Sequence, residues 1–199
     1  MLSGVILAAG DSTRMGSPKA ALLTPDGITF VTRIVRTLYE AGVIDLVIVT
    51  GRHHDAVIDA LTRDRPVTSP RIVRNPDPSR GQLSSLIAGM DAVVTPSSEA
   101  VMMTLVDVPL VRVSTVTAAI EAWRRSRAPI VRPAIGDRHG HPVIFDRAVF
   151  EELRRAPLDE GAKSVVRAHE HEIANVAVDD EGCVRDVDTP RDYEALREL

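Results

Sequence analysis

The sequence predicts an α/β fold in three layers, in which a mostly parallel β-sheet carries helices on both faces. Short apolar segments alternate with longer segments whose apolar residues recur at helical spacing, a pattern typical of parallel sheets. The first apolar segment, Val5–Ala8, is apolar at every position, as expected for a buried strand. The chain has 199 residues, which favours one domain with a sizeable core.

The first half of the chain continues this alternation. Apolar residues at positions 30, 31, 34, 35, 38 and 41 form a helical stripe over Phe30–Ala41, which Gly42 closes. The other strands expected in this half are Ile44–Thr50, Arg71–Arg74 and Val101–Val106. The helices expected after them are Asp55–Thr62, Gln82–Val94 and Val113–Arg125.

The second half predicts an antiparallel excursion of the sheet. A Gly-Asp-Arg-His-Gly turn and an Asp-Asp-Glu-Gly turn each lie between two apolar segments, and the second is a hairpin signal. The strands expected here are Ile130–Ala134, His141–Phe145, Ile173–Val178 and Cys183–Val187. The helices expected here are 147–154, 160–168 and Thr189–Leu199.

Charge and composition exclude several classes of function. The net charge is −4 and aromatic residues make up 3% of the chain, which argues against a nucleic-acid-binding face. No apolar run approaches the roughly 20 residues that span a bilayer, and no secretory signal is visible. The single cysteine, Cys183, fits a reducing compartment. We therefore expect a cytoplasmic protein with no nucleic-acid partner and no membrane partner.

Four strands are expected to end at one crevice. In parallel sheets, ligands bind outside the carboxyl ends of the strands. The residues that follow these ends are Gly10, Gly51, Asn75 and Asp107. Four segments that are far apart in the sequence are thereby predicted to converge.

The loop after the first strand has the composition of an anion-binding loop. Gly10 and Gly16 allow close approach of backbone to a ligand, Arg14 offers a planar fork and Lys19 a compact charge. Lys19 is one of two lysines beside 22 arginines, the other being Lys163, which favours a specific role for its ammonium group. Neither the Walker pattern nor the Gly-x-Gly-x-x-Gly dinucleotide pattern fits this loop.

The motif that remains is Leu-Ala-Ala-Gly-x-Ser-x-Arg-Met-Gly-x-Pro-Lys, residues 7–19. It resembles the signature of nucleotidyltransferases with a glycosyltransferase-A-like Rossmann fold, and most closely the molybdenum cofactor cytidylyltransferase and guanylyltransferase family. Further segments resemble that family in the same order along nearly the whole chain. They are residues 75–86, 106–110, 138–142, 159–163 and 186–190.

The resemblance implies a single Rossmann-like nucleotidyltransferase domain over residues 1–199, with a nucleotide-binding half (1–112) and an acceptor-binding half (113–199). It implies Mg²⁺-dependent transfer of CMP from CTP, or of another nucleotide, to molybdenum-bearing molybdopterin, with release of pyrophosphate. Cytidylyl members usually carry Leu-Ala-Ala-Gly and guanylyl members Leu-Ala-Gly-Gly, so Ala9 favours CTP. A molybdoenzyme that receives the cofactor is a further implied partner.

The resemblance also implies four groups of site residues. The expected catalytic residues are Arg14, Lys19 and Asp107. The nucleotide is expected to contact Leu7, Ala8, Ala9, Gly10, Arg14, Lys19, Thr50, Asn75, Gly81, Ser84 and Ser85. The acceptor is expected to contact His139, Gly140, His141, Pro142 and Lys163. The expected Mg²⁺ ligands are Asp107 and Asp188.

Nucleotidyl transfer requires these residue types. The acceptor phosphate is already anionic, so the obstacle is repulsion between two polyanions, which fixed cations and a divalent metal relieve. Asp107 offers the oxygen ligands that Mg²⁺ prefers. Asp188 has a second interpretation, because it or Thr189 could begin the helix in which Pro190 follows.

Other interpretations remain open. The chain could be a nucleotidyltransferase for a sugar phosphate or another small phosphate acceptor, or a non-catalytic factor that matures and delivers the cofactor. It could also be an oxidoreductase on the same scaffold, although the missing dinucleotide motif counts against this. His139 and His141 bind an anionic ligand or only support their turn, and zinc is disfavoured because no cysteine or acidic cluster has the required spacing.

Overall fold

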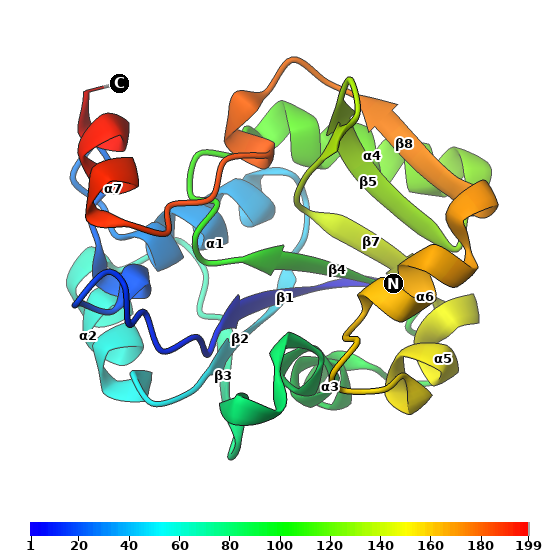
Figure 1. Ribbon diagram of the computed structural model, residues 1–199, viewed down its shortest axis with the longest axis horizontal. Coiled ribbons are helices and arrows are strands. Elements are labelled where there is room, and N and C mark those ends of the chain that lie inside the picture. Colours follow the sequence, from blue (N-terminus) through cyan, green and yellow to red (C-terminus); the bar gives the residue numbers. More distant parts are fainter. Residues whose placement is uncertain (199) are drawn as a thin grey trace.

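The computed structural model describes residues 1–198 and contains an eight-stranded sheet (Figure 1). The strands are β1 (Leu2–Ala8), β2 (Asp45–Thr50), β3 (Arg71–Arg74), β4 (Ala100–Leu105), β5 (Ile130–Ile135), β6 (Arg138–His139), β7 (Val143–Asp146) and β8 (Ile173–Ala177). Their order is β3-β2-β1-β4-β7-β5-β6, and β8 pairs with the other edge of β5. β7 and β6 are antiparallel to their neighbours, which confirms a mostly parallel sheet with an antiparallel excursion.

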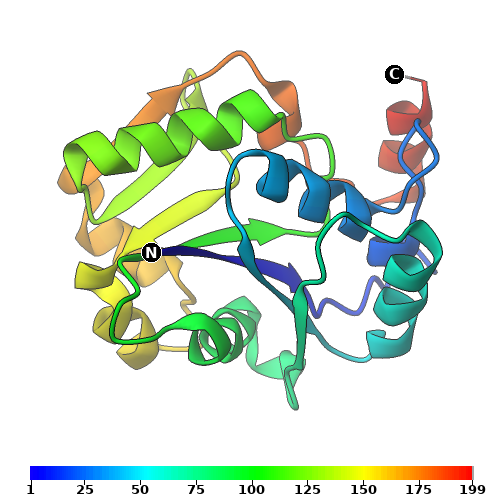
Figure 2. The ribbon, with the colours of Figure 1, turned by 180° about the vertical axis from the view of Figure 1, so that it is seen from behind.

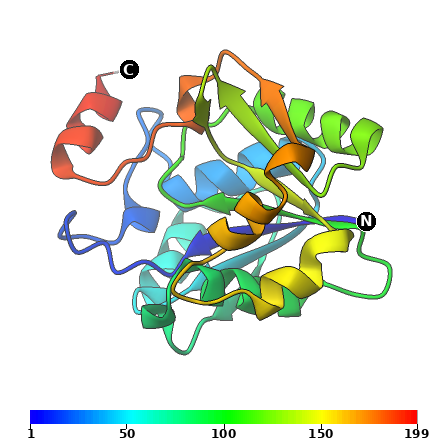
Figure 3. The ribbon, with the colours of Figure 1, turned by 45° about the vertical axis from the view of Figure 1, so that its right-hand side comes forward.

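Helices cover both faces of the sheet. They are α1 (Phe30–Glu40), α2 (His54–Asp64), α3 (Gln82–Val93), α4 (Val113–Ser126), α5 (Phe150–Arg155), α6 (Lys163–Ala168) and α7 (Pro190–Arg197). Side chains of a strand alternate between its two faces, so each face has its own core. Ile6 and Ile48 pack in the core that includes α1 and α4, and Val5 and Val49 in the core that includes α3 and α5. Figures 2 and 3 show the three layers from behind and from the side. None of the described helices is both long enough and apolar enough to cross a membrane.

The register of the strands aligns their carboxyl ends. β1 lies between β2 and β4, and Leu7 is level with Val49 on one side and with Leu105 on the other. β5 runs parallel to β4, because β7 is antiparallel to both. The loops that follow β1, β2 and β4 therefore begin at the same edge of the sheet.

Helix α3 reaches this edge because it packs very close to the sheet. A Cβ atom on Gly89 would lie 2.4 Å from Val5 Cγ1 and 2.9 Å from Val49 Cγ2. Contacts shorter than 3.0 Å are not tolerated by a real side chain, so this packing requires glycine. The first turn of α3 is thereby held beside the ends of β1 and β2.

The expected strand Cys183–Val187 is wrong, and so is the expected hairpin. β8 pairs in parallel with β5, and Glu181–Cys183 forms a short 3₁₀ turn instead. The buried Asp180 carboxylate accepts hydrogen bonds from the Gly182 amide (3.1 Å) and from the Thr115 hydroxyl (2.7 Å) at the start of α4. This carboxylate attaches the segment to α4, so the chain does not return along β8.

A second buried carboxylate connects the ends of α1 and α2. Asp64, at the end of α2, accepts hydrogen bonds from the amide (2.7 Å) and the hydroxyl of Thr29, which caps α1. Burial raises the pKa of Asp64, but hydrogen bonds from Arg63 and Thr29 outweigh it and lower that pKa to about 2. The carboxylate therefore stabilises the fold in its ionised form.

We expect Asp64→Asn to lower the free energy of unfolding by about 1–2 kcal/mol at pH 7. The folded-state pKa of about 2 lies below the unfolded value, so the stabilisation is complete above about pH 4 and disappears as the pH falls through 2. Urea unfolding of both proteins at several pH values measures this difference. The two proteins should converge in stability near pH 2, and a difference that does not change with pH would contradict the assignment.

Candidate functional site

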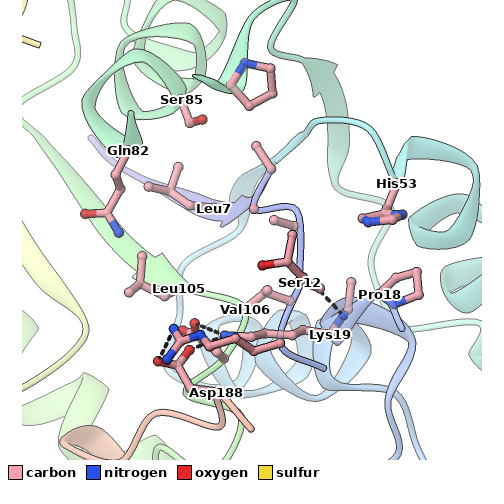
Figure 4. A pocket seen from close by; sticks show the side chains of 18 of the residues that line it. Leu7, Ser12, Pro18, Lys19, His53, Gln82, Ser85, Leu105, Val106 and Asp188 are labelled. Atoms are coloured by element: carbon pink, nitrogen blue, oxygen red, sulfur yellow. Dashed lines mark hydrogen bonds and ion pairs between the residues drawn. The ribbon is translucent and has the colours of Figure 1, made fainter. Parts of the chain in front are cut away.

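A cavity of about 270 Å³ opens at the carboxyl edge of β1 and β4 (Figure 4). The loop after β1 forms one side of it, the first turn of α3 another, and the end of β4 together with Asp188 completes it. Ten residues predicted from the sequence line this cavity. They are Leu7, Ala8, Ala9, Gly10, Arg14, Lys19, Gly81, Ser85, Asp107 and Asp188.

The loop after β1 is held in place by side-chain contacts. The Ser12 hydroxyl accepts a hydrogen bond from the Lys19 amide at 3.1 Å, and Ser12 itself has a positive φ of 50°. His53 Nε2 lies 3.1 Å from the carbonyl oxygen of Asp11. The loop is therefore shaped around the cavity, with Gly16 in the left-handed region (φ 68°) at its turn.

Two cations and two carboxylates form an ion-pair cluster at the cavity. Lys19 Nζ lies 2.8 Å from Asp107 Oδ2 and also contacts Asp188 Oδ1, while Arg14 Nη2 lies 2.9 Å from Asp188 Oδ2. The Lys19 side chain is 12% exposed and that of Arg14 68%, so only the second is free to move in solvent. Figure 4 shows Lys19 and Asp188 pointing toward each other below the cavity.

The cluster fixes the charge of its members. Burial lowers the pKa of Lys19, but hydrogen bonds to Asp107 and Asp188 outweigh it, so the pKa is raised above its usual value. The hydrogen bond from Lys19 lowers the pKa of Asp188. Burial, together with the charges of Asp107 and Asp188, raises the pKa of the nearby Asp186. Lys19 is therefore a fixed cation, and Asp188 a fixed anion, at neutral pH.

Asp107 retains an unused oxygen atom. Its Oδ2 accepts from Lys19, whereas its Oδ1 is buried and has no hydrogen-bond partner among the described residues. A buried carboxylate oxygen without a partner is unfavourable unless a ligand satisfies it. Carboxylate oxygens are the ligands that a hard divalent cation prefers, so Asp107 and Asp188 are the residues of this cluster that could hold one.

Asp188 is available to the cluster because another residue caps α7. Thr189 is the N-cap, and its hydroxyl and the Asp192 carboxylate form a reciprocal capping box. The Val187 amide donates to the Asp107 carbonyl oxygen at 2.9 Å, which holds the two aspartates together. The sequence left open whether Asp188 starts the helix, and the structure assigns that role to Thr189.

Three predicted nucleotide contacts lie behind the cavity wall. Thr50 is fully buried, and its hydroxyl lies 2.8 Å from His54 Nδ1 and donates to the Val73 carbonyl oxygen. The Asn75 amide group donates to the hydroxyls of Ser84 and Ser85, at 2.9 Å each. Thr50, Asn75 and Ser84 are thus placed to support the lining residues, and their contact with a nucleotide stays a prediction.

Several lining residues were not singled out from the sequence. They are Ser12, Thr13, Pro18, Ala20, His53, Pro78, Gln82, Leu105 and Val106. Gly51 allows Pro78 to approach the loop after β1. A Cβ atom at position 51 would lie 2.5 Å from the Ala9 carbonyl oxygen and 2.9 Å from Pro78 Cγ. The position of Gly51 directly after β2 is the sequence signal for this close approach.

The predicted acceptor residues do not line the cavity. His139 is exposed on β6, and Lys163 is exposed at the start of α6. The His141 amide donates to the Cys183 carbonyl oxygen at 2.8 Å, and Pro142 is buried next to it. His141 Nδ1 is buried without a partner among the described residues, and burial lowers the pKa of this ring. His141 is therefore neutral at pH 7.

Comparisons with known proteins found a matching family model and several similar proteins. A family model described as a MobA-like NTP transferase domain matches residues 4–173. The chain is 32% identical to nicotine blue oxidoreductase of Paenarthrobacter nicotinovorans, over 94% of this chain and 92% of that protein. It is 25% identical to molybdenum cofactor cytidylyltransferase of Escherichia coli (strain K12), over 98% and 94%.

A solved structure is similar over the whole chain. Rv0371c from Mycobacterium tuberculosis H37Rv has a TM-score of 0.82 and 32% identity, and the match covers 100% of this chain and 97% of that one. A complex of Rv0371c with manganese has a TM-score of 0.75 and 31% identity, over 99% and 98%.

Proposed function

The chain belongs to the MobA-like NTP transferase family, and we propose from this that it transfers CMP from CTP to the phosphate of molybdenum-bearing molybdopterin. Pyrophosphate is the second product. The similarity to a molybdenum cofactor cytidylyltransferase over nearly the whole chain supports this base and this acceptor. Ala9 in the loop after β1, where guanylyl-transferring members usually have glycine, supports CTP as the donor.

The observation that carries the proposal is the ion-pair cluster of Arg14, Lys19, Asp107 and Asp188 at the cavity. A nucleoside triphosphate needs fixed positive charge for its phosphates, and this loop supplies two cations beside exposed backbone. Phosphate oxygens compete with Asp188 for Arg14 and Lys19. In this role the two side chains position the triphosphate and stabilise the charge that develops on pyrophosphate as it leaves.

The two carboxylates fit a divalent metal. Asp107 and Asp188 would hold it, and the unpartnered Oδ1 of Asp107 provides a ligand atom that the protein does not use otherwise. A divalent metal held by these two residues would neutralise phosphate charge during the transfer. The manganese complex of Rv0371c supports a metal for this chain, and we propose Mg²⁺ as the physiological ion.

The remaining lining residues suit a nucleoside. The backbone of Leu7–Gly10 faces the cavity, and amide and carbonyl groups of such a segment recognise a base edge. Gly81 and Ser85 bring the start of α3 to the same cavity. The acceptor would approach from the side of His141, which lies between the end of β4 and the β6 turn.

A second candidate activity is hydride transfer, as the name of nicotine blue oxidoreductase suggests for that protein. It is favoured by 32% identity over nearly the full length of both chains. A nicotinamide dinucleotide also carries a pyrophosphate that Arg14 and Lys19 could bind. Hydride transfer gives no role to two carboxylates with a free oxygen at the phosphate site, and for this reason we favour nucleotidyl transfer.

The test is a binding and turnover comparison on the purified protein. CTP, GTP, ATP and NADPH are titrated calorimetrically with and without Mg²⁺, and pyrophosphate release from each triphosphate is followed with molybdopterin as acceptor. We expect CTP with Mg²⁺ to bind most tightly and to release pyrophosphate only when the acceptor is present. Binding of NADPH without metal, together with no binding of any triphosphate, would favour the oxidoreductase.

A further inference from the structure

One region of the sheet face next to the cavity is not covered by a helix. On this face, Ile130 of β5 and Ile173 of β8 pack in the core with α5 and α6, but Asn175 and Ala177, further along β8, are exposed. In Figure 1, α5 and α6 lie well below the far ends of β5 and β8, and α4 lies behind these strands. The uncovered part of the face carries Arg132, Asn175 and His139.

Arg132 is held in this region without an ion pair, and the nearest carboxylate that acts on its charge is that of Glu170. Its Nε donates to Asn175 Oδ1 at 2.9 Å, across the paired strands β5 and β8, and it forms no ion pair with any described residue. The neighbouring Arg138, in contrast, makes two hydrogen bonds to the Glu181 carboxylate, at 2.9 and 2.6 Å. Arg132 is partly buried, and burial lowers the pKa of its guanidinium group, although it remains charged at neutral pH. Its two Nη atoms are therefore oriented donors with no acceptor in the described part of the chain.

The register of the strands relates Arg132 to the cavity. Ile144 of β7 is level with Met102 on one side and with Val131 on the other. One position along, Val143 pairs with Met103, and the β5–β7 ladder sets Arg132 level with Val143. Met103 lies two residues before Leu105, which lines the cavity. Neighbouring strands lie about 4.8 Å apart, so the backbone of Arg132 is roughly 10 Å from that of Met103.

A molecule that extends from the cavity over His141 would reach this region. Arg132 lies on the same face as Ala134, two residues before it on β5, and His139 is paired with Ala134. Burial, and then the charge of Arg132, lower the pKa of His139, so its ring is neutral at pH 7 and offers one donor and one acceptor. The donors of Arg132 and the ring of His139 thus face the same space.

We propose that Arg132, oriented by Asn175, binds the far end of the phosphate acceptor and selects acceptors that end in a planar heterocycle. The proposal rests on the nucleotidyl transfer proposed above. A guanidinium group donates two parallel hydrogen bonds in one plane, which match a carbonyl oxygen and an adjacent ring nitrogen, as in a pterin. The hydroxyls of a sugar phosphate do not lie in one plane, so the same group distinguishes the two acceptor classes. The acceptor phosphate then lies at the ion-pair cluster.

The probe for this proposal is hydroxymethylpterin monophosphate, a fluorescent pterin that carries one phosphate. It is titrated into the wild-type protein, Arg132→Gln, Arg132→Lys and the control Arg124→Gln, and CTP with Mg²⁺ is titrated into each separately. Arg124 is exposed on α4, on the opposite face of the sheet, and its replacement by glutamine removes the same charge. We expect Arg132→Gln to weaken binding of the pterin at least about tenfold, and Arg132→Lys, which loses the planar fork, to weaken it nearly as much. Binding of CTP should change in none of them.

Each outcome decides between the two proposals. Equal binding of the pterin by wild type and Arg132→Gln overturns the role of Arg132 and leaves nucleotidyl transfer intact. If the wild type binds CTP but not the pterin, the heterocycle assignment is wrong, and the nucleotidyl donor site stands. If the wild type binds neither CTP nor another triphosphate, the proposed function itself fails. An equal loss in Arg124→Gln would reduce the effect to overall charge and would also overturn the assignment.

Discussion

Asp107→Asn is expected to lower the rate of metal-dependent nucleotidyl transfer by about 10²–10³-fold. Asparagine keeps the size of the side chain but removes the charge and replaces one ligand oxygen by a donor nitrogen. Asp107 lies at the end of β4 with one oxygen bound to Lys19 and the other free, so no nearby described carboxylate offers the same pair of atoms. The measurement is pyrophosphate release from CTP, together with calorimetric binding of CTP with and without Mg²⁺.

The matched control is Asp137→Asn, which removes the same charge in an exposed turn between β5 and β6. It should leave both the rate and the metal dependence unchanged. In the Asp107 variant, CTP binding should lose most of its dependence on Mg²⁺ while circular dichroism and melting temperature show that the fold is retained. Full metal-dependent binding by a folded Asp107→Asn protein would show that the metal binds elsewhere.

Lys19→Met is expected to have opposite effects on the nucleotide and on the metal. The transfer rate should fall by about 10²–10³-fold, because the variant lacks the buried ammonium that we propose holds the triphosphate. Mn²⁺ alone should bind roughly tenfold more tightly, because Lys19 no longer occupies the space between Asp107 and Asp188 and no longer neutralises them. Electron paramagnetic resonance of free Mn²⁺ measures this affinity without any turnover.

Lys163→Met is the control, since Lys163 is the other lysine of the chain and is exposed at the start of α6. It should leave the Mn²⁺ affinity unchanged. Weaker binding of Mn²⁺ by Lys19→Met would mean that the two carboxylates depend on Lys19 for their positions, and the competition between ammonium and metal would be refuted.

The sequence predicted the layers and the opening loop because both are encoded locally. Apolar spacing identifies a helix such as Phe30–Glu40 within a single window, and a parallel sheet follows from the alternation of such windows with strands. The motif from Leu7 to Lys19 has glycines, a guanidinium and an ammonium at fixed spacing, so a ligand-facing loop could be predicted there, and its residues line the cavity. The convergence of four strand ends then followed from the direction of the strands alone.

What the sequence did not predict depends on contacts between distant residues. The strand expected at Cys183–Val187 does not form, because the Asp180 carboxylate accepts a hydrogen bond from the Thr115 hydroxyl. The local sequence does not indicate this contact. The contacts of Lys19 with both Asp107 and Asp188 likewise join positions 88 and 169 residues apart. Arg132 could not be singled out from the sequence, because the sequence does not show which arginines form ion pairs and which do not.

The separation between Lys19 and Asp188 also has a consequence for the newly made chain. A ribosome adds about 5–20 residues per second, so Asp188 emerges on the order of ten to thirty seconds after Lys19. During that interval the loop after β1 has been made, but Asp188, the last residue of the ion-pair cluster in the sequence, has not. If the proposed transfer requires Asp188, nascent chains of this protein should be inactive until Asp188 has been added.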